Sequence, residues 1–378
     1  MKKSEVKKMK FKIDKSLFLD GLLKISKTIA KNTQIPITTG ICVKTIEEGI
    51  QLTSTNNERS TKVTIPPTED TVIERYGGSV LPSTLIDVVK KLSGDINIET
   101  GENFNTTIVS GRSKIELHGL DPEEFPQIMN VSGECFTLNG EAFKEVVRKT
   151  AYAASVNEAR PILQGVFMQV NQNTLSSVCT DSHRLAQTSV ECHADECNIS
   201  VPVPAIALKD ISSIVNSEQD VSITANQQQF AVQQGNVTFI VRILDGTYPD
   251  VSRIIPKESR SRLRLNRNEL KNCLEQLMIL DKDKPTIRMK VDGMNVLLST
   301  IKSDHGFATS QLFYSDSEGQ IEEIDLTFNG RYLFEAVRVM DGDLIDLFFH
   351  ESERPFLIKP TDKENELSLI LPVKILGR

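Results

Sequence analysis

The 378-residue sequence contains no low-complexity tract and no apolar run near the ~18 residues that a membrane-spanning helix requires. Its lysine-rich start, MKKSEVKKMKF, is not followed by the apolar segment of a secretory signal peptide. We therefore expect a globular, cytoplasmic chain of two or three domains, with residues 1–9 as a short flexible tail.

Cysteines are few, and they follow no repeating spacing. Within ECHADEC, residues 191–197, Cys192, His193 and Cys197 lie close enough to suggest a metal, but the sequence has no second CxxC or HxxxH pair to complete four ligands. We therefore expect a polar loop here, no metal or other cofactor, and reduced thiols. The six cysteines are Cys42, Cys135, Cys179, Cys192, Cys197 and Cys273.

Basic residues are not in excess, since the formal net charge is −7 and the isoelectric point is near 5.5. Proteins that bind nucleic acid usually carry a basic surface, so the sum of charges argues against such a partner. The distribution of the basic residues can reverse that conclusion, because a local basic surface suffices to bind phosphates.

Three segments of the chain resemble one another: residues 11–22, 136–147 and 263–274. Their starts are separated by 125 and 127 residues (136 − 11 and 263 − 136). Each begins with alternating apolar residues and continues through a capping residue (Asp14, Asn139 or Asn266) into a helical pattern. A second strand-then-helix pattern follows in each third, at residues 79–92, 199–215 and 325–340. The repeat predicts three similar α+β domains, each with two helices packed on antiparallel sheets, at residues 10–128, 129–256 and 257–378.

Basic residues recur beside the apolar stripe of the first helix in each repeat. The stripes consist of Leu22, Ile25 and Ile29 in the first repeat, of Phe143, Val146 and Val147 in the second, and of Leu270, Leu274 and Leu277 in the third. The basic residues off these stripes are Lys24, Lys27 and Lys31, then Lys144 and Arg148, then Arg267 and Lys271. A single basic helix face is usually only solvated, but its recurrence in three domains indicates a surface that contacts phosphates.

The stretch CTDSHRLA, residues 179–186, contains the residue types of a serine hydrolase triad. If it forms a strand, Asp181 and His183 share one face and Ser182 points away, so the serine is out of reach of the histidine. The sequence also has no GxSxG motif to expose a nucleophile. We therefore interpret the segment as part of a binding site, and the chain as a protein that is not an enzyme.

Four segments, ARPILQGV (159–166), TDSHRLA (180–186), LDGTYPDVSRIIP (244–256) and LILPVKI (369–375), resemble the peptide-binding region of bacterial replicative sliding clamps, the beta subunit of DNA polymerase III. Residues 110–128 resemble the interface strand of the same family, and the similarity extends over roughly residues 10 to 375. The resemblance implies a head-to-tail homodimer that closes six domains into a ring around duplex DNA. Its implied partners are double-stranded DNA, a clamp loader, and DNA polymerase and repair factors that bind through short peptides of glutamine, leucines and a terminal phenylalanine.

The resemblance also implies three sets of site residues. The implied peptide pocket consists of Leu163, Thr180, His183, Arg184, Leu185, Tyr248, Pro249, Ile254, Pro355, Leu369 and Leu371. The implied DNA channel carries Lys24, Lys27, Lys31, Lys90, Lys144, Arg148, Arg160, Lys209, Arg267, Lys271 and Arg338. The implied dimer interface joins Arg112, Lys114, Ile115 and Leu117 of the first domain to Ile279, Leu280, Glu322 and Glu323 of the third.

The sequence departs from the family pattern at three places. Ser182 stands where many members have glycine, STNNERST (54–61) replaces an acidic segment, and VPVPAIAL (201–208) lacks a basic pair. A divergent paralogue with a repair or accessory role is therefore an alternative to the main replicative clamp. Two further alternatives are a hydrolase that uses His183 and an assembly protein that dimerises without DNA.

Overall fold

The computed structural model describes residues 8–195, 197–281, 283, 285–301, 306–351 and 354–374. These residues form two compact units, Met1–Gly140 with Asp210–Ile243, and Glu141–Lys209 with Leu244–Arg378. Among the described helices, none combines the length and the apolar character that a bilayer crossing requires.

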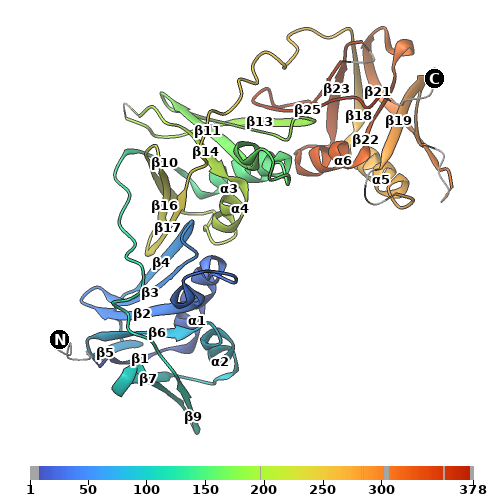
Figure 1. The fold of residues 1–378 in the computed structure, drawn as a ribbon. Helices are drawn as coiled ribbons and strands as arrows, with labels where there is room; N and C mark the ends of the chain where they lie inside the picture. Colours follow the sequence, from blue (N-terminus) through green and yellow to red (C-terminus); the bar gives the residue numbers. More distant parts are fainter. Residues whose placement is uncertain are drawn as a thin grey trace. The chain divides into compact units, whose positions relative to one another are not determined.

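The first unit contains two antiparallel sheets and the helices α1 (Lys15–Ile25) and α2 (Leu85–Lys91) (Figure 1). The short 3₁₀ segments here are η1 (Ser26–Thr28), η2 (Pro36–Thr39) and η3 (Glu102–Phe104). The five-stranded sheet has the order β5 (Thr71–Arg75), β1 (Lys10–Ile13), β7 (Ile96–Thr100), β8 (Thr106–Ser110) and β9 (Ser113–Leu117). The eight-stranded sheet has the order β10 (Glu134–Asn139), β15 (Asp220–Ala225), β16 (Gln229–Gln234), β17 (Val237–Arg242), β4 (Arg59–Ile65), β3 (Gly49–Thr55), β2 (Gly40–Ile46) and β6 (Gly77–Pro82).

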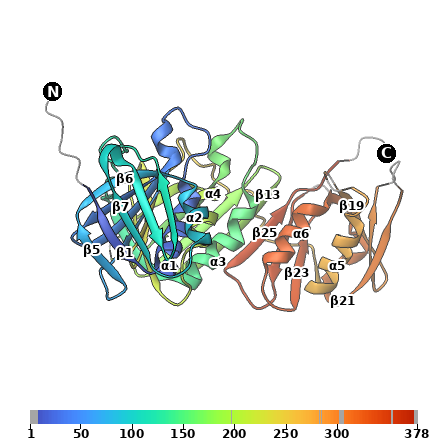
Figure 2. The ribbon, with the colours of Figure 1, turned by 90° about the horizontal axis from the view of Figure 1, so that it is seen from below.

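The second unit is built on one sheet of twelve antiparallel strands. Figures 1 and 2 show α5 (Arg267–Leu277) and α6 (Gly330–Val339) side by side on this unit, and both contribute to one apolar core. The helices α3 (Gly140–Thr150) and α4 (Ala205–Ser212) lie at the boundaries between the units in the sequence, and the 3₁₀ segments are η4 (Ala151–Ala153), η5 (Pro161–Gln164) and η6 (Ile321–Glu323). The strand order is β14 (Ser200–Pro204), β11 (Gly165–Asn171), β12 (Thr174–Thr180), β13 (Arg184–Glu191), β25 (Glu366–Ile370), β24 (Phe356–Pro360), β23 (Leu344–Phe349), β18 (Ser261–Asn266), β21 (Thr309–Gly319), β20 (Asn295–Thr300), β19 (Thr286–Asp292) and β22 (Asp325–Asn329).

The strand-then-helix repeat predicted from the sequence is present. The Asp14 carboxylate accepts hydrogen bonds from the backbone N–H groups of Ser16 and Leu17, at 2.7 and 3.2 Å, and starts α1. Asn266 likewise accepts from the N–H of Glu269 at 3.0 Å and starts α5, so two of the three predicted caps are confirmed. The apolar stripes on α1, α3 and α5 are buried, except that Ile29 lies beyond α1 and is half-buried.

Neighbouring repeats are joined by strand pairing at two seams. β17, the last strand of the second repeat, pairs with β4 of the first, and β25, the last strand of the third repeat, pairs with β13 of the second. Since β4 and β13 each follow a hairpin with the preceding strand (β3 and β12), they occupy equivalent positions in their repeats. The same connection is therefore used twice along the chain.

Two expectations about the N-terminal region are wrong. Met9 is fully buried in the core beside β1 and β7, so it does not belong to a flexible tail; residues 1–7 lie outside the described part. Helix α1 ends at Ile25, Lys27 lies in η1, and Lys31 lies beyond both. The helical spacing assumed for Lys24, Lys27 and Lys31 therefore does not hold, although Lys27 and Lys31 are exposed.

Candidate functional site

The segment TDSHR spans the turn of a hairpin, so the strand geometry assumed for Asp181, Ser182 and His183 does not hold. β12 ends at Thr180 and β13 begins at Arg184, and Ser182 between them has a φ of 77°. The Asp181 carboxylate accepts hydrogen bonds from the N–H groups of His183 and Arg184, both at 2.9 Å, which closes an Asx-type turn. A left-handed φ is most easily adopted by glycine, so the Ser182 position costs backbone strain.

This turn does not assemble a hydrolytic triad. Ser182 and His183 are both exposed, and the second oxygen of Asp181 accepts a hydrogen bond from the Arg184 Nε at 3.0 Å. The carboxylate therefore orients the backbone and an arginine, whereas a triad requires it to orient the imidazole.

Beside this turn, six buried apolar side chains form a compact cluster. In the strand register Leu185 lies opposite Leu369, and Leu369 lies opposite Leu357 on the next strand. Leu163, Val178 and Tyr248 complete the buried cluster from segments outside these strands. The structure therefore brings together four of the residues predicted for the pocket, Leu163, Leu185, Tyr248 and Leu369.

Tyr248 connects the cluster to the turn. Its hydroxyl oxygen accepts a hydrogen bond from the N–H of Thr180 at 3.1 Å, and its ring stacks on Phe167 with 5.2 Å between the ring centroids. Burial raises the pKa of the Tyr248 phenol, so the hydroxyl stays protonated.

The rim of the cluster is less buried than its floor. Leu371 is half-buried, and its N–H donates to the carbonyl of His183 at 2.9 Å. Ile254 is 48% exposed, while Pro249 lines an adjoining cavity and Pro355 is half-buried just before β24. An apolar floor with partly exposed apolar rim residues suits the side chains of a short peptide.

Arg184, one of the residues implied for the pocket, has all three of its guanidinium nitrogens engaged within the chain. Its guanidinium is buried, pairs with Glu335 of α6, donates to the carbonyl of Tyr152 at 2.7 Å, and lies over the Tyr152 and Tyr332 rings, with centroids at 5.5 and 4.5 Å. Its guanidinium therefore joins the second repeat to the third and supports the turn at Asp181.

The predicted DNA-facing residues are distributed over all three repeats, and several already have partners. Lys24 pairs with Asp20 at 2.6 Å, Lys90 with Asp87 at 3.5 Å, and Arg148 with Asp341 at 2.9 Å. The exposed residues of the set are Lys27, Lys31, Lys90, Arg148, Arg160, Lys209 and Arg338, and the half-buried ones are Lys24, Lys144, Arg267 and Lys271.

Lys149 is a junction residue that the sequence analysis missed. Its ammonium group is buried and lies 2.5 Å from Glu145, 2.9 Å from Asp341 and 2.5 Å from Glu366. Since lysine is almost never buried without partners, this cluster is one ionic unit that joins α3 to β25 and to the segment after α6. Arg148 and Lys149 are adjacent basic residues near the end of the same helix. The sequence pattern alone does not show which of the two is buried.

The residues predicted for a dimer interface belong to the two different units of the chain. β9 forms the edge of its sheet, where Ile115 and Leu117 are half-buried and Lys114 pairs with Glu116 at 2.9 Å. Arg112 is exposed before this strand. In the second unit, Ile279 is 68% exposed after α5, Leu280 is half-buried, and Glu322 and Glu323 are exposed on η6.

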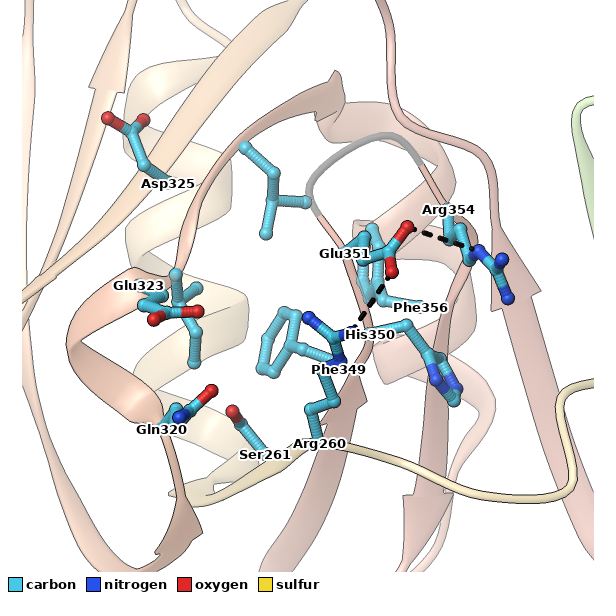
Figure 3. Close-up of a pocket in the computed structure, with 12 residues that line it drawn as sticks. Arg260, Ser261, Gln320, Glu323, Asp325, Phe349, His350, Glu351, Arg354 and Phe356 are labelled. Carbon is cyan, nitrogen blue, oxygen red and sulfur yellow. Dashed lines mark ion pairs between the residues drawn. The ribbon is translucent and has the colours of Figure 1, made fainter.

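Glu323 also lines a cavity of about 210 Å³ in the third repeat (Figure 3). Most of its charged lining is paired, since Glu351 lies 3.1 Å from Arg260 and 3.5 Å from Arg354. Burial, and to a smaller extent the charges of Arg354 and Arg260, lower the pKa of His350. Figure 3 shows the His350 imidazole pointing away from Glu323. This cavity therefore brings no histidine to face a nucleophile or a carboxylate across it.

The ECHADEC segment differs from the polar loop that we expected. Cys192 and Cys197 are buried, and His193 is exposed; Glu196 lies outside the described residues. No cluster of three or more metal-ligating side chains occurs in the part of the chain that the structure describes. Burial raises the pKa of Cys192, and it raises the pKa of Cys42 and Cys179 to about 12, so these thiols stay protonated.

Three similar domains joined edge to edge, with a buried apolar cluster bordered by partly exposed apolar residues and with basic helix residues, define a protein of the DNA-clamp class. Three family descriptions match consecutive stretches: the N-terminal, central and C-terminal domains of the DNA polymerase III beta subunit, at residues 9–129, 137–250 and 252–374. The chain belongs to this family, the beta sliding clamps of bacteria, and is therefore a non-catalytic DNA sliding clamp.

Individual relatives agree with this assignment. Beta sliding clamps of Staphylococcus epidermidis and Staphylococcus aureus are 31% and 32% identical over 376 residues, which cover 97% of this chain and 99% of each relative. The crystal structure of the DNA polymerase sliding clamp from Bacillus subtilis is 29% identical, with a TM-score of 0.93 over 97% of this chain and 99% of that chain.

Proposed function

We propose that two copies of this chain close head to tail into a ring around duplex DNA. The ring works in the cytoplasm, where it tethers DNA polymerase and repair factors through peptides bound in the groove beside Asp181–His183. A clamp loader is required to open the closed ring on DNA. The observation that carries this proposal is the strand pairing that joins neighbouring repeats. This pairing occurs twice within the chain, and in the described residues one matching pair of strand edges takes no part in it.

The third repeat has the strand that the first two repeats use at their seams. Like β4 and β13, β21 follows a hairpin with the preceding strand, β20, and its Thr309–Phe313 half pairs with β20 on one side. No described strand pairs with the other side of this half, and β9, the last strand of the first repeat, pairs only with β8 in the described chain. A third seam between β9 of one copy and β21 of another therefore repeats the two internal seams.

Ile279, which follows α5, supports the same conclusion. At the internal seam, Tyr152 follows α3 and its hydroxyl bonds the Ser368 hydroxyl on β25 at 2.7 Å. The third repeat is offset from the second by 127 residues at this point (263 − 136), which places Ile279 at the position of Tyr152 (279 − 127). Ile279 is 68% exposed in the single chain, as expected for a residue whose partner strand belongs to another copy.

Head-to-tail contacts are heterologous, because they join two different surfaces of the same chain. Such contacts close into a ring when the rotations from one copy to the next add up to a full turn. Two copies have two free β9 edges and two free β21 edges, so each edge is satisfied once in a closed dimer. Covering these edges also removes backbone groups that otherwise promote aggregation.

DNA contact in such a ring is electrostatic and independent of sequence. Exposed basic residues such as Lys27, Lys209 and Arg338 contact phosphates, which carry no base information and so permit sliding. The net charge of −7 then reflects acidic residues placed elsewhere on the chain.

Loading on nicked circular DNA, followed by linearisation, tests the proposal. A closed ring remains on the circle during gel filtration and is lost when the DNA is cut, because it slides off the ends. A protein that binds DNA directly remains bound after cutting, and that result contradicts the ring. Replacing Lys27, Lys144 and Lys209 by alanine should weaken binding equally for unrelated duplexes and reduce the salt slope by about 0.9 for each phosphate that the variant no longer neutralises.

A further inference from the structure

We propose that the peptide groove continues into a second subsite, which binds an apolar side chain two or three residues away from the anchor of the same partner peptide. The proposal rests on the proposed peptide-binding function and extends it to a surface beyond the predicted pocket. Its basis is a cavity of about 590 Å³ on the second unit.

The floor of this cavity is a single row of side chains across four strands. In the strand register Phe167 lies opposite Val178, Val178 opposite Gln187, and Gln187 opposite Leu367. All four line the cavity, and Gln169 and Ser176, which face each other, line its far end. The segment between β17 and β18, which Figure 1 shows as a long coil, supplies the other wall with Val251 and Ile255.

The register shows that this row directly continues the groove. The groove row contains Leu185 opposite Leu369, and the cavity row contains Gln187 opposite Leu367. Since side chains two residues apart on a strand lie on the same face, the two rows are neighbours, about 7 Å apart. An extended peptide covers that distance with two residues. A segment of two or three residues next to the anchor, which we call the flank, therefore reaches from one row to the other.

Tyr248 belongs to both parts of this surface. It is buried in the groove cluster, where its hydroxyl bonds the Thr180 N–H, and it lines the cavity, where its ring stacks on Phe167. Val178, Leu367 and Ile255 also contact both the cluster and the cavity. The apolar surface is therefore continuous from the anchor site to the cavity.

The lining specifies the chemistry of the flank. Its apolar walls accept a leucine-sized side chain, while the exposed Gln169 and half-buried Gln187 can bond the peptide backbone. Of the two charged residues in the lining, Asp250 already bonds Ser252 and pairs with Arg253 at 3.6 Å, whereas Lys257 makes no ion pair within the described chain. A carboxylate next to the apolar residue therefore complements Lys257.

Calorimetry with matched peptides tests the subsite. The short probe is a peptide that contains one glutamine, two leucines and a phenylalanine. Each extended probe adds a three-residue flank at the N-terminal or at the C-terminal end of this peptide. The flank contains either leucine and glutamate, or glycine and serine at the same positions. We expect the leucine–glutamate flank at one end to tighten binding about tenfold relative to the glycine–serine flank, as burial of one apolar side chain predicts.

Two variants locate the effect. Gln169→Trp fills the far end of the cavity and should abolish the tenfold gain without changing the affinity of the short probe. Gln233→Trp, on an exposed position of β16, is the matched control and should leave the gain intact. Thermal melting of both variants shows whether they fold.

The outcomes separate the two proposals. If the short probe binds and no leucine–glutamate flank tightens it, or if the gain survives in folded Gln169→Trp, the second subsite is wrong and the groove stands. If the short probe does not bind wild-type protein at all, the peptide function itself is wrong, and the subsite with it.

Discussion

Ile279 offers the sharpest test of how two copies meet. It is 68% exposed in the single chain, and the repeat places it where Tyr152 contacts the last strand of the neighbouring domain. Replacing it by alanine should therefore weaken the dimer while leaving the fold of each chain unchanged.

The expected size follows from burial. Full burial of an isoleucine side chain contributes about 1.5–3 kcal/mol. Since about two-thirds of the Ile279 side chain is still exposed before association, each interface loses about 1–2 kcal/mol in the alanine variant. A closed dimer contains two such interfaces, so the total is about 2–4 kcal/mol, or roughly a 30- to 1,000-fold higher dissociation constant.

Sedimentation equilibrium measures this dissociation constant directly, with the 42.2 kDa chain as the monomer reference. The control is Ile206→Ala, which removes the same atoms from a residue of α4 that is 62% exposed and not assigned to a seam. Changing Ile279 and Leu280 together to aspartate should leave only folded monomer, because it places unpaired charges in the interface. A double variant that stays dimeric, or a control that dissociates equally, refutes the assignment of the interface.

Three further predictions concern the groove and the junction beside it. Leu371→Ala should weaken a bound clamp peptide about tenfold or more in calorimetry without changing the dimer, whereas Ser182→Ala should have little effect; equal affinity of wild type and Leu371→Ala contradicts the pocket. Arg184→Met should lower the melting temperature, since removing one partner of a buried ion pair costs about 3 kcal/mol, and an unchanged melting curve shows that its contacts are not stabilising. Burial alone raises the pKa of Asp341, but hydrogen bonds from Lys149, Lys363 and Arg148 outweigh it and hold that pKa well below its ordinary value of 3.8. The resulting stabilisation is complete above pH 3.8 and is lost as the pH falls through the lowered value, so below pH 4 wild type should lose melting temperature more steeply than Asp341→Asn.

The sequence predicted the repeat and its caps because both depend on short-range patterns. An alternating strand, an Asp14 or Asn266 cap and an apolar helical stripe are each local, and their recurrence after about 125 residues needs no knowledge of contacts. The family resemblance then supplied residues that lie far apart in the sequence and share one buried cluster, such as Leu163 and Leu369.

Features that depend on contacts between distant segments were not predictable in this way. Arg184 is buried because Glu335, Tyr152 and Tyr332 surround it from other segments, and none of these contacts is visible in TDSHRLA. The turn at Ser182 was missed because a serine with positive φ gives no sequence signal, while a glycine there would have indicated one.

The proposed groove and the ionic junction lie on opposite faces of one strand pair, so the proposed site requires two domains. On β25, Leu367 and Leu369 face the groove and its extension, whereas Glu366 and Ser368 face the helix side, where they bond Lys149 and Tyr152. Because side chains alternate along a strand, a slip of one residue between β13 and β25 would bring the glutamate into the groove and the leucines to Lys149. The buried Lys149–Glu366 pair therefore opposes any other register. The strand pairing that joins the second and third domains thus also determines the shape of the proposed peptide site.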